Sequence, residues 1–164
     1  MAGIKCFAWN CGGLRRSTAS TTSKVIFFVK TFKNDFDLFF FLEIHHKDGN
    51  DIPNELLRFR DTHHILHSET GTHDTHTGII GLIRNEYVIS DIEHIIQGRI
   101  LGLKLTDTST RTTYRISVVY LPTNQNLDVE GVQDIVRKLR LHDHNDTTSY
   151  MLSGDFNFIN YEEI

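Results

Sequence analysis

The sequence predicts an α/β protein that forms a single domain. Residues 4–10 and 37–43 are apolar on both faces, which is typical of strands that are covered on two sides. Segments 17–33 and 127–141 carry apolar residues at helical spacing. Between residues 78 and 121, short β runs alternate with turns. The length of 164 residues, with 39% hydrophobic and 23% charged residues, suits one soluble domain with a sizeable core.

The first predicted strand, residues 4–10, ends in an asparagine. Its two faces are both apolar, one with Ile4, Cys6 and Ala8 and the other with Phe7 and Trp9. Asn10 stands at the tip of this strand, before paired glycines that permit a tight turn. We therefore expect a buried strand that presents an amide side chain at its end.

A helix and a second buried strand are predicted next. Segment 17–33 offers Ser and Thr residues as N-caps and an apolar stripe of Val25, Phe28, Val29 and Phe32. The run 37–43 is almost entirely apolar and closes with an acid, so a buried strand would deliver Glu43 at its carboxyl end.

The middle of the chain predicts a short helix and an antiparallel meander. Residues 53–60 suit the helix. The meander is expected from four β runs, at 78–83, 87–96, 98–105 and 113–121.

Histidines are concentrated between residues 62 and 84. They are His63, His64, His67, His73 and His76. Their spacing does not match the usual zinc ligand patterns, and the cysteines lie far away in sequence. We therefore interpret them as histidines of strand faces and loops.

A second amphipathic helix, residues 127–141, leads to a strand that ends in Gly-Asp. Asp155 and Asn157 are two positions apart, so they lie on the same side of the extended strand end. Two oxygen-bearing side chains aimed at one point suit Mg²⁺ with a phosphate oxygen beside it. Taken alone, a turn with a solvated acid is the commoner interpretation of this pattern.

Charge and cysteine usage limit the classes of function. A net charge of −4 gives no broad basic field, so any contact with nucleic acid must be local or assisted by a metal. Cys6 and Cys11 point to opposite faces, which does not favour a disulfide and suggests a reducing compartment. There is no signal peptide pattern and no apolar run of about 20 residues. An intracellular protein, cytoplasmic or nuclear, with no membrane partner is expected.

Six short motifs together resemble the endonuclease/exonuclease/phosphatase superfamily of metal-dependent phosphodiesterases. They are Trp9–Leu14, Phe41–His45, Thr77–Leu82, Gly98–Leu101, Val119–Pro122 and Gly154–Asn157. They follow the order of the family, which is far more specific than any single motif, and they extend over nearly the whole chain. The combination is most similar to the apurinic-type endonuclease domain of non-LTR retrotransposons, which nicks target DNA.

The resemblance implies a four-layer α/β/β/α sandwich and a set of site residues. Asn10 and Glu43 would hold or orient Mg²⁺ or Mn²⁺. Tyr120 would lie near the scissile phosphate, and Asp155 and Asn157 would position the nucleophile and the transition-state oxygens. The further candidates for substrate binding are Arg99 and His45. Each residue also has a structural interpretation: Asn10 as a turn cap, Tyr120 as a core residue and Arg99 as a strand-face cation.

The sequence also departs from the family. There, a long further stretch follows the Gly-Asp motif and ends in an Asp-His pair, whereas here the chain stops at Ile164 and Asp143-His144 precedes that motif. Loss of a catalytic histidine typically costs a factor of about 10²–10⁴ in rate. The chain alone is therefore expected to be inactive or weak.

A sandwich truncated after the Gly-Asp strand would lack most of its second sheet. Strands 38–42, 79–83 and 116–121 would then expose an apolar face. Two hypotheses follow. One is a Mg²⁺-dependent DNA endonuclease-like phosphodiesterase; the other is a non-catalytic, domesticated remnant that acts as a structural or binding component. In the second case a larger complex, or a homodimer, would cover the open face.

Overall fold

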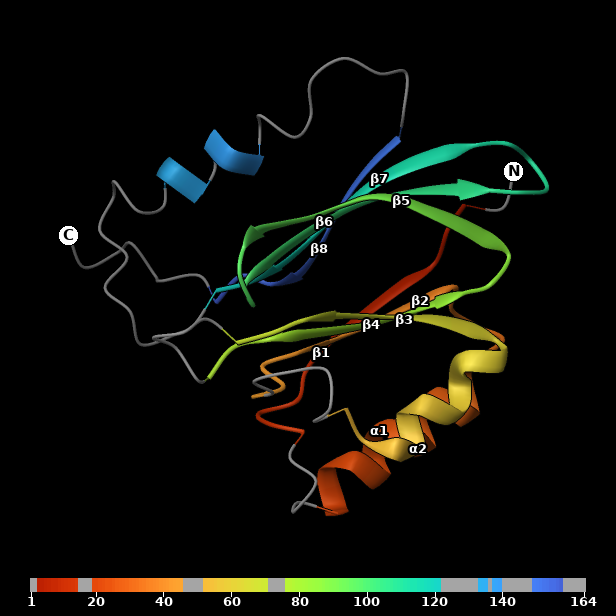
Figure 1. The fold of residues 1–164 in the computed structure, drawn as a ribbon, viewed down its shortest axis with the longest axis vertical. Helices are drawn as coiled ribbons and strands as arrows, with labels where there is room; N and C mark the ends of the chain where they lie inside the picture. The colour runs from red at the N-terminus through yellow and green to blue at the C-terminus, as the bar shows by residue number, and fades with distance from the viewer. Residues whose placement is uncertain are drawn as a thin grey trace.

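The structure is a computed structural model that describes residues 3–14, 19–45, 52–70, 76–121, 133–135, 137–139 and 149–157. It has four layers, with two stacked β-sheets between helices on the two outer sides (Figure 1). The predicted α/β class and the four-layer sandwich are confirmed.

The first sheet is formed by the N-terminal half and has the strand order β1-β2-β4-β3. The strands are β1 (Cys6–Asn10), β2 (Leu38–Leu42), β3 (His63–Ser68) and β4 (Ile79–Arg84). The helices are α1 (Ala19–Phe32) and α2 (Asn54–Leu57), the latter followed by a 3₁₀ turn at Arg58–Asp61. Strands β1 and β2 are parallel, with α1 as their crossover, and the other pairs are antiparallel. The predictions of helices at 17–33 and 53–60 are confirmed.

Strand β2 is central because both of its faces are buried. Phe39 and Phe41 pack against the helical layer, where Val25 and Val29 of α1 are fully buried. Leu38, Phe40 and Leu42 point the other way, into the core between the sheets. The alternation of side chains along a strand thus explains why the run is apolar throughout.

The second sheet has the order β5-β6-β7-β8. The strands are β5 (Tyr87–Ile96), β6 (Ile100–Asp107), β7 (Thr113–Tyr120) and β8 (Ser149–Asp155). The first three form an antiparallel meander, as predicted, and β8 joins β7 in parallel. Helical residues 133–135 and 137–139 lie on the outer face, where Ile135 packs on Ile100 and Val119. The rest of the predicted helix 127–141 lies outside the described residues.

Two expectations about the sheets were wrong. Strand β4 is not part of the meander, because it pairs with β2 and β3 and the turn at residues 85–86 carries the chain into the other sheet. Nor is the second sheet mostly absent. Its inner side chains, including Leu103 and Ile116, cover the apolar face of β2 and β4 that was expected to be open.

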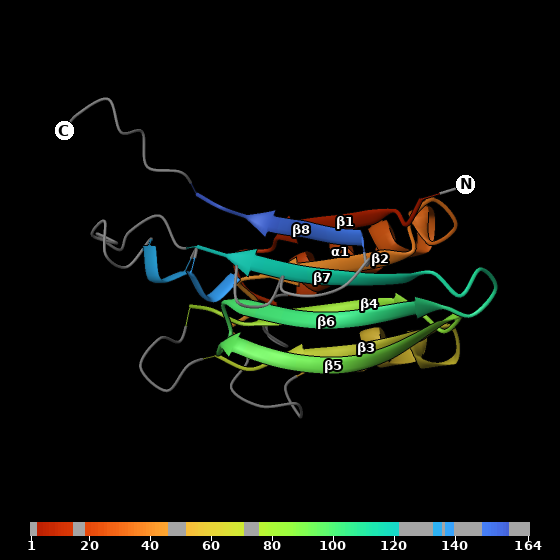
Figure 2. The same ribbon diagram turned by 90° about the horizontal axis from the view of Figure 1, so that it is seen from above.

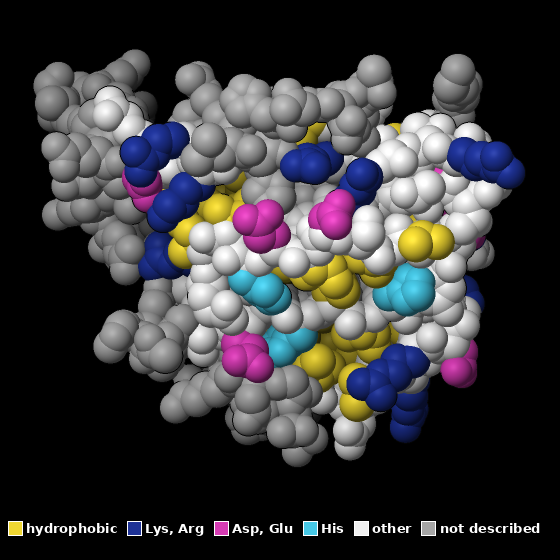
Figure 3. Space-filling model, turned by 45° about the horizontal axis from the view of Figure 1, so that its top comes forward, with side chains coloured by type: hydrophobic (Ala, Val, Ile, Leu, Met, Phe, Trp, Pro, Cys, Tyr) yellow, Lys and Arg dark blue, Asp and Glu magenta, His cyan; other side chains and the backbone are white. Residues whose placement is uncertain are grey.

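Few large apolar side chains remain exposed in the described part of the chain. Val88 and Ile92 on β5 are 56% and 48% exposed, and Leu152 on β8 is 44% exposed. Because β5 and β8 are opposite edges of the sheet, these residues do not form one patch. On the face of the molecule drawn in Figure 3, hydrophobic groups are interspersed with polar and charged side chains. Because the second sheet covers the face that was expected to be open, no larger complex or homodimer is needed to bury it.

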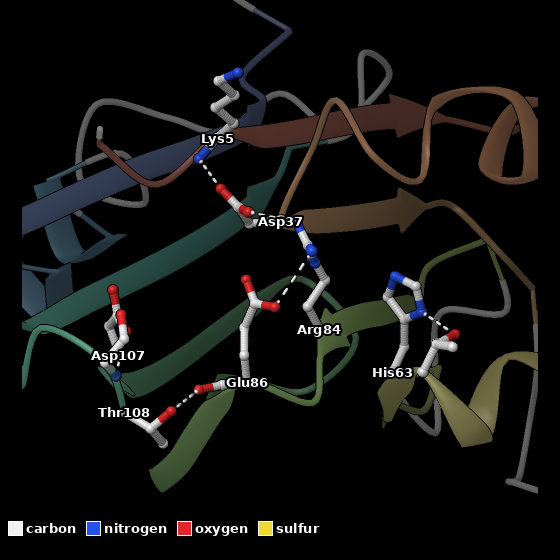
Figure 4. Close-up of polar contacts among 9 residues, drawn as sticks. Lys5, Asp37, His63, Arg84, Glu86, Asp107 and Thr108 are labelled. Atoms are coloured by element: carbon white, nitrogen blue, oxygen red, sulfur yellow. Dashed lines mark hydrogen bonds and ion pairs between the residues drawn. The ribbon is translucent and has the colours of Figure 1, made fainter. Parts of the chain in front are cut away.

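A cluster of charged residues lies at the N-terminal end of β2, whereas Glu43 follows the C-terminal end of that strand (Figure 4). The carboxylate of Asp37 accepts hydrogen bonds from the backbone N–H of Lys5 at 2.7 Å and from Nη1 of Arg84 at 3.3 Å. Arg84 also forms an ion pair with Glu86 at 3.3 Å. These contacts link the entries to β1 and β2 with the end of β4.

The histidine-rich segment contains strand β3, which was not predicted as a separate element. His63 is 3% exposed and its ring packs against Phe39 and Phe59. Its Nδ1 lies 2.8 Å from Oγ1 of Thr62, and its Nε2 has no hydrogen-bond partner among the described residues. Burial lowers the pKa of His63 below its ordinary value of 6.5, and the charge of Arg84 lowers it further.

The lowered pKa of His63 predicts a pH-dependent stability. Above about pH 6.5 the imidazole is neutral in both the folded and the unfolded chain; below it, the unfolded chain binds a proton that the folded chain resists. The free energy of unfolding should therefore fall as the pH drops below about 6.5. We expect urea denaturation at about pH 7.5 and about pH 5.5 to show a smaller drop for His63→Phe than for the unmodified protein. An equal drop in both would contradict this account.

Among the described residues, no helix has the length and apolarity needed to span a membrane.

Candidate functional site

The candidate site lies on the rim where the strands of both sheets end. Asn10 ends β1 and Glu43 follows β2, which runs parallel to β1. Tyr120 ends β7 and is in register with Asp155 at the end of β8. Strands β1 and β8 lie over one another at the same edge of the two sheets (Figure 2). The parallel pairs therefore bring side chains from far apart in the sequence to one rim.

A hydrogen bond between side chains joins the two sheets at this rim. Nδ2 of Asn10 donates to Oδ2 of Asp155 at 3.0 Å, and Oδ1 of Asn10 accepts from the backbone N–H of Gly12 at 3.0 Å. The other carboxylate oxygen of Asp155 accepts from the backbone N–H of Asn157 at 3.1 Å. Both oxygens of Asp155 are thus oriented by neutral donors, and the turn glycine fixes the Asn10 amide.

Glu43 and His45 are held in a strained segment that follows β2. Both have positive φ angles, 56° and 60°, which non-glycine residues rarely adopt. Their backbone is clamped from both sides: the N–H of Gly13 donates to the carbonyl of Glu43 at 2.7 Å, and the N–H of His45 donates to the carbonyl of Thr77 at 2.9 Å. Oε1 of Glu43 lies 3.3 Å from Nε2 of His45, with the side chains 23% and 11% exposed. The backbone of Glu43 is therefore held in place by hydrogen bonds, while its side chain remains partly exposed to solvent.

The remaining predicted residues lie around the same rim but differ in burial. Tyr120 is only 4% exposed and its ring belongs to the core between the sheets. Its backbone N–H donates to the carbonyl of Arg99 at 2.8 Å, which places the turn before β6 beside the end of β7. The side-chain Nδ2 of Asn157 donates to the backbone carbonyl of Leu121. Tyr120 is thus also a core residue, which was the structural interpretation offered for it from the sequence.

The donor chemistry of the rim suits a hard divalent cation. Asn10, Glu43 and Asp155 contribute amide and carboxylate oxygens, which Mg²⁺ and Mn²⁺ prefer. Burial, and next the charge of Glu43, raise the pKa of the Cys11 thiol to about 12, so no thiolate is available here. Within the described ranges there is no group of three or more His, Cys, Asp or Glu side chains arranged for a metal. His73 and Asp143-His144 lie outside those ranges.

Two residues of the rim, Gly13 and His76, were not among the predicted site residues. A Cβ at position 13 would lie 3.0 Å from Nδ1 of His45, and the ring of His76 lies edge-on to that of His45 at 4.8 Å. The glycine pair indicated a turn, but nothing in the sequence showed which side chain packs on it. The contact with His76 joins distant segments and depends on the pairing of β2 with β4.

Comparison with known proteins identifies the fold. No protein-family model matches the sequence, and no curated protein is significantly similar to it. Among solved structures, an AP endonuclease from Leishmania major superposes with a TM-score of 0.69 at 15% identity, over 94% of this chain and 55% of that one. An endonuclease/exonuclease/phosphatase family protein from Bacteroides thetaiotaomicron gives a TM-score of 0.71 at 12% identity, over 98% and 66%. A mannosyl-6-phosphatase from the same organism gives 0.69 at 12%, over 98% and 68%.

These neighbours share the architecture at low sequence identity, and two of them, an AP endonuclease and a mannosyl-6-phosphatase, are named for different activities. The chain spans 55% of the length of the AP endonuclease and about two thirds of the other two proteins. The superpositions cover 94–98% of this chain. The chain therefore has the endonuclease/exonuclease/phosphatase fold.

Proposed function

We propose that the rim is the active site of a metal-dependent phosphodiesterase that cleaves DNA. The observation that carries the proposal is the hydrogen bond from Asn10 to Asp155, which fixes a carboxylate at the end of β1, where Asn10 pairs with Leu42, the residue before Glu43. An AP endonuclease among the structural neighbours supports DNA as the substrate class. The net charge of −4 means that a local site, rather than a broad basic surface, must bind the phosphate backbone.

Glu43 and Asn10 would hold Mg²⁺ or Mn²⁺ in this proposal. The bound cation would neutralise charge on a non-bridging phosphate oxygen and lower the pKa of a bound water. The carboxylate of Glu43 is suited to this because it is oriented by its own clamped backbone yet remains partly exposed.

The other rim residues would act on the nucleophile and the phosphate. Asp155 would accept the proton of the attacking water, because the donors to its carboxylate in the described part of the chain are neutral and leave lone pairs for this purpose. Asn157 would orient the water beside it. Tyr120 and Arg99 would contact the phosphate oxygens on which charge develops in the transition state.

The test is a cleavage assay with Glu43→Ala. The purified chain with Mg²⁺ should nick supercoiled plasmid and a duplex with one abasic site at a low rate, in line with the weak activity expected of the chain alone, and EDTA should abolish both activities. Glu43→Ala should lower the rate by at least about 10–100-fold, the loss that is typical even for residues that only support a metal ligand. Glu55→Ala removes an exposed acid from α2 and serves as the matched control, with an unchanged rate.

Absence of Mg²⁺-dependent cleavage of either DNA would contradict the proposal. It would favour the hypothesis of a non-catalytic structural or binding component instead. Cleavage that is equal in Glu43→Ala and in the unmodified chain would show that the metal site lies elsewhere.

A further inference from the structure

We infer that His45 is a positioning residue that holds the carboxylate of Glu43 at the rim, in space that Gly13, a glycine with a φ of 101°, leaves open. The inference rests on the proposed function, in which Glu43 is a metal ligand. It assigns His45 to the support of that ligand, in place of a direct contact with DNA.

The ring of His45 is confined by three neighbours. Its Nε2 lies 3.3 Å from Oε1 of Glu43. On another side, its Nδ1 is the atom nearest to the place that a Cβ on Gly13 would take, at 3.0 Å, which is closer than about nine in ten real Cβ contacts. The ring of His76 packs against it at an interplanar angle of 85°. A ring that is 11% exposed and confined in this way has little freedom to turn toward a ligand in solvent.

The backbone explains why Glu43 and His45 meet. Ile44, between them, is fully buried in the core under the first sheet, while the residues on both sides of it have positive φ angles. Hydrogen bonds from Gly13 and Leu14 on one side, and to Gly78 and Thr77 on the other, hold this conformation. The side chains of Glu43 and His45 consequently lie in contact with each other. The hydrogen bonds from the flanking segments maintain the strained backbone.

The contact has a simple chemical consequence. With a proton on Nε2, the imidazole donates to Oε1 of Glu43, which leaves the other carboxylate oxygen for a cation. Residues that orient a metal ligand in this way typically change metal affinity by about 10–100-fold when they are replaced. His45 should therefore affect the binding of the metal itself, before any DNA is present.

The experiment measures the affinity for Mn²⁺ alone, from the electron paramagnetic resonance signal of free Mn²⁺ in a titration with the full chain. His45→Leu keeps similar bulk but removes the donor, and should weaken Mn²⁺ binding by about 10–100-fold. His45→Gln can place its amide N–H where Nε2 lies, and should retain an affinity close to that of the unmodified chain. Circular dichroism melting of each variant shows that the fold is kept.

Glu43→Ala is the arm that separates this inference from the proposed function. If Glu43→Ala loses Mn²⁺ affinity while His45→Leu keeps it, the positioning role is wrong and the proposed metal site stands. Equal losses in His45→Leu and His45→Gln would also overturn the positioning role, because the donor would not matter. If the unmodified chain does not bind Mn²⁺, or Glu43→Ala binds it as well as the unmodified chain does, the metal role of Glu43 fails and the inference fails with it.

Discussion

Asp155→Asn is expected to lower the rate of DNA nicking by a factor of about 10²–10⁴, the range for loss of a general acid or base. The amide cannot accept the proton of the attacking water, although it has the same shape as the carboxylate. Its Oδ1 can still accept the hydrogen bond from Asn10 or from the backbone of Asn157. Because the –NH₂ of the new amide then faces the other donor, one hydrogen bond is lost, and a stability loss of about 1 kcal/mol should accompany the much larger loss in rate.

The measurement is single-turnover cleavage of the abasic duplex, together with thermal unfolding of the same samples. Asp35→Asn is the matched control, because Asp35 is an exposed acid after α1, near the start of β2 and away from the rim. It should cleave at the unmodified rate. A rate for Asp155→Asn within a few-fold of that rate would rule out Asp155 as the base.

Gly154→Ala is expected to prevent folding. Gly154 has a φ of 142°, and a Cβ there would lie 1.9 Å from the carbonyl oxygen of Val119, its partner on β7. The obstacle is backbone in a parallel strand pair, so it cannot move without loss of the register that aligns Tyr120 with Asp155. We expect destabilisation by more than about 4 kcal/mol, which is an exceptional value for one substitution and a large part of the total stability of a domain.

Soluble yield, circular dichroism and thermal unfolding measure this effect. Gly3→Ala is the control, because an added Cβ there meets nothing within 4 Å, and it should behave as the unmodified chain does. A cooperative unfolding transition of Gly154→Ala near the original temperature would show that β7 and β8 do not pair as described.

The strands and the principal helix could be predicted because local patterns determine them. Phe39 and Phe41 alternate with Leu38, Phe40 and Leu42, and both sets need burial, so the segment could only be a covered strand. The stripe through Val25 and Val29 likewise indicated the buried side of α1. The placement of Asn10, Glu43 and Asp155 at strand ends follows from the apolar runs that precede them, whereas their chemical roles remain a proposal.

The assignment of strands to sheets could not be predicted from the same patterns. Strands β4 and β5 are separated by a two-residue turn and are both rich in apolar residues, which suggested a hairpin. Each of them instead pairs with other strands, β4 with β2 and β3, and β5 with β6. This choice depends on contacts between distant segments, such as the core that Leu42 shares with Val118. The error about an open apolar face has the same origin.

The most direct test of the central claim is the position of a metal ion on the rim. Crystals grown with Mn²⁺ should show an anomalous diffraction peak within about 2.2 Å of a Glu43 carboxylate oxygen, the distance expected for such a ligand. Asp155 should lie close enough to contact a water bound to that ion. A well-occupied Mn²⁺ peak elsewhere on the chain, with the rim empty at the same concentration, would contradict the account.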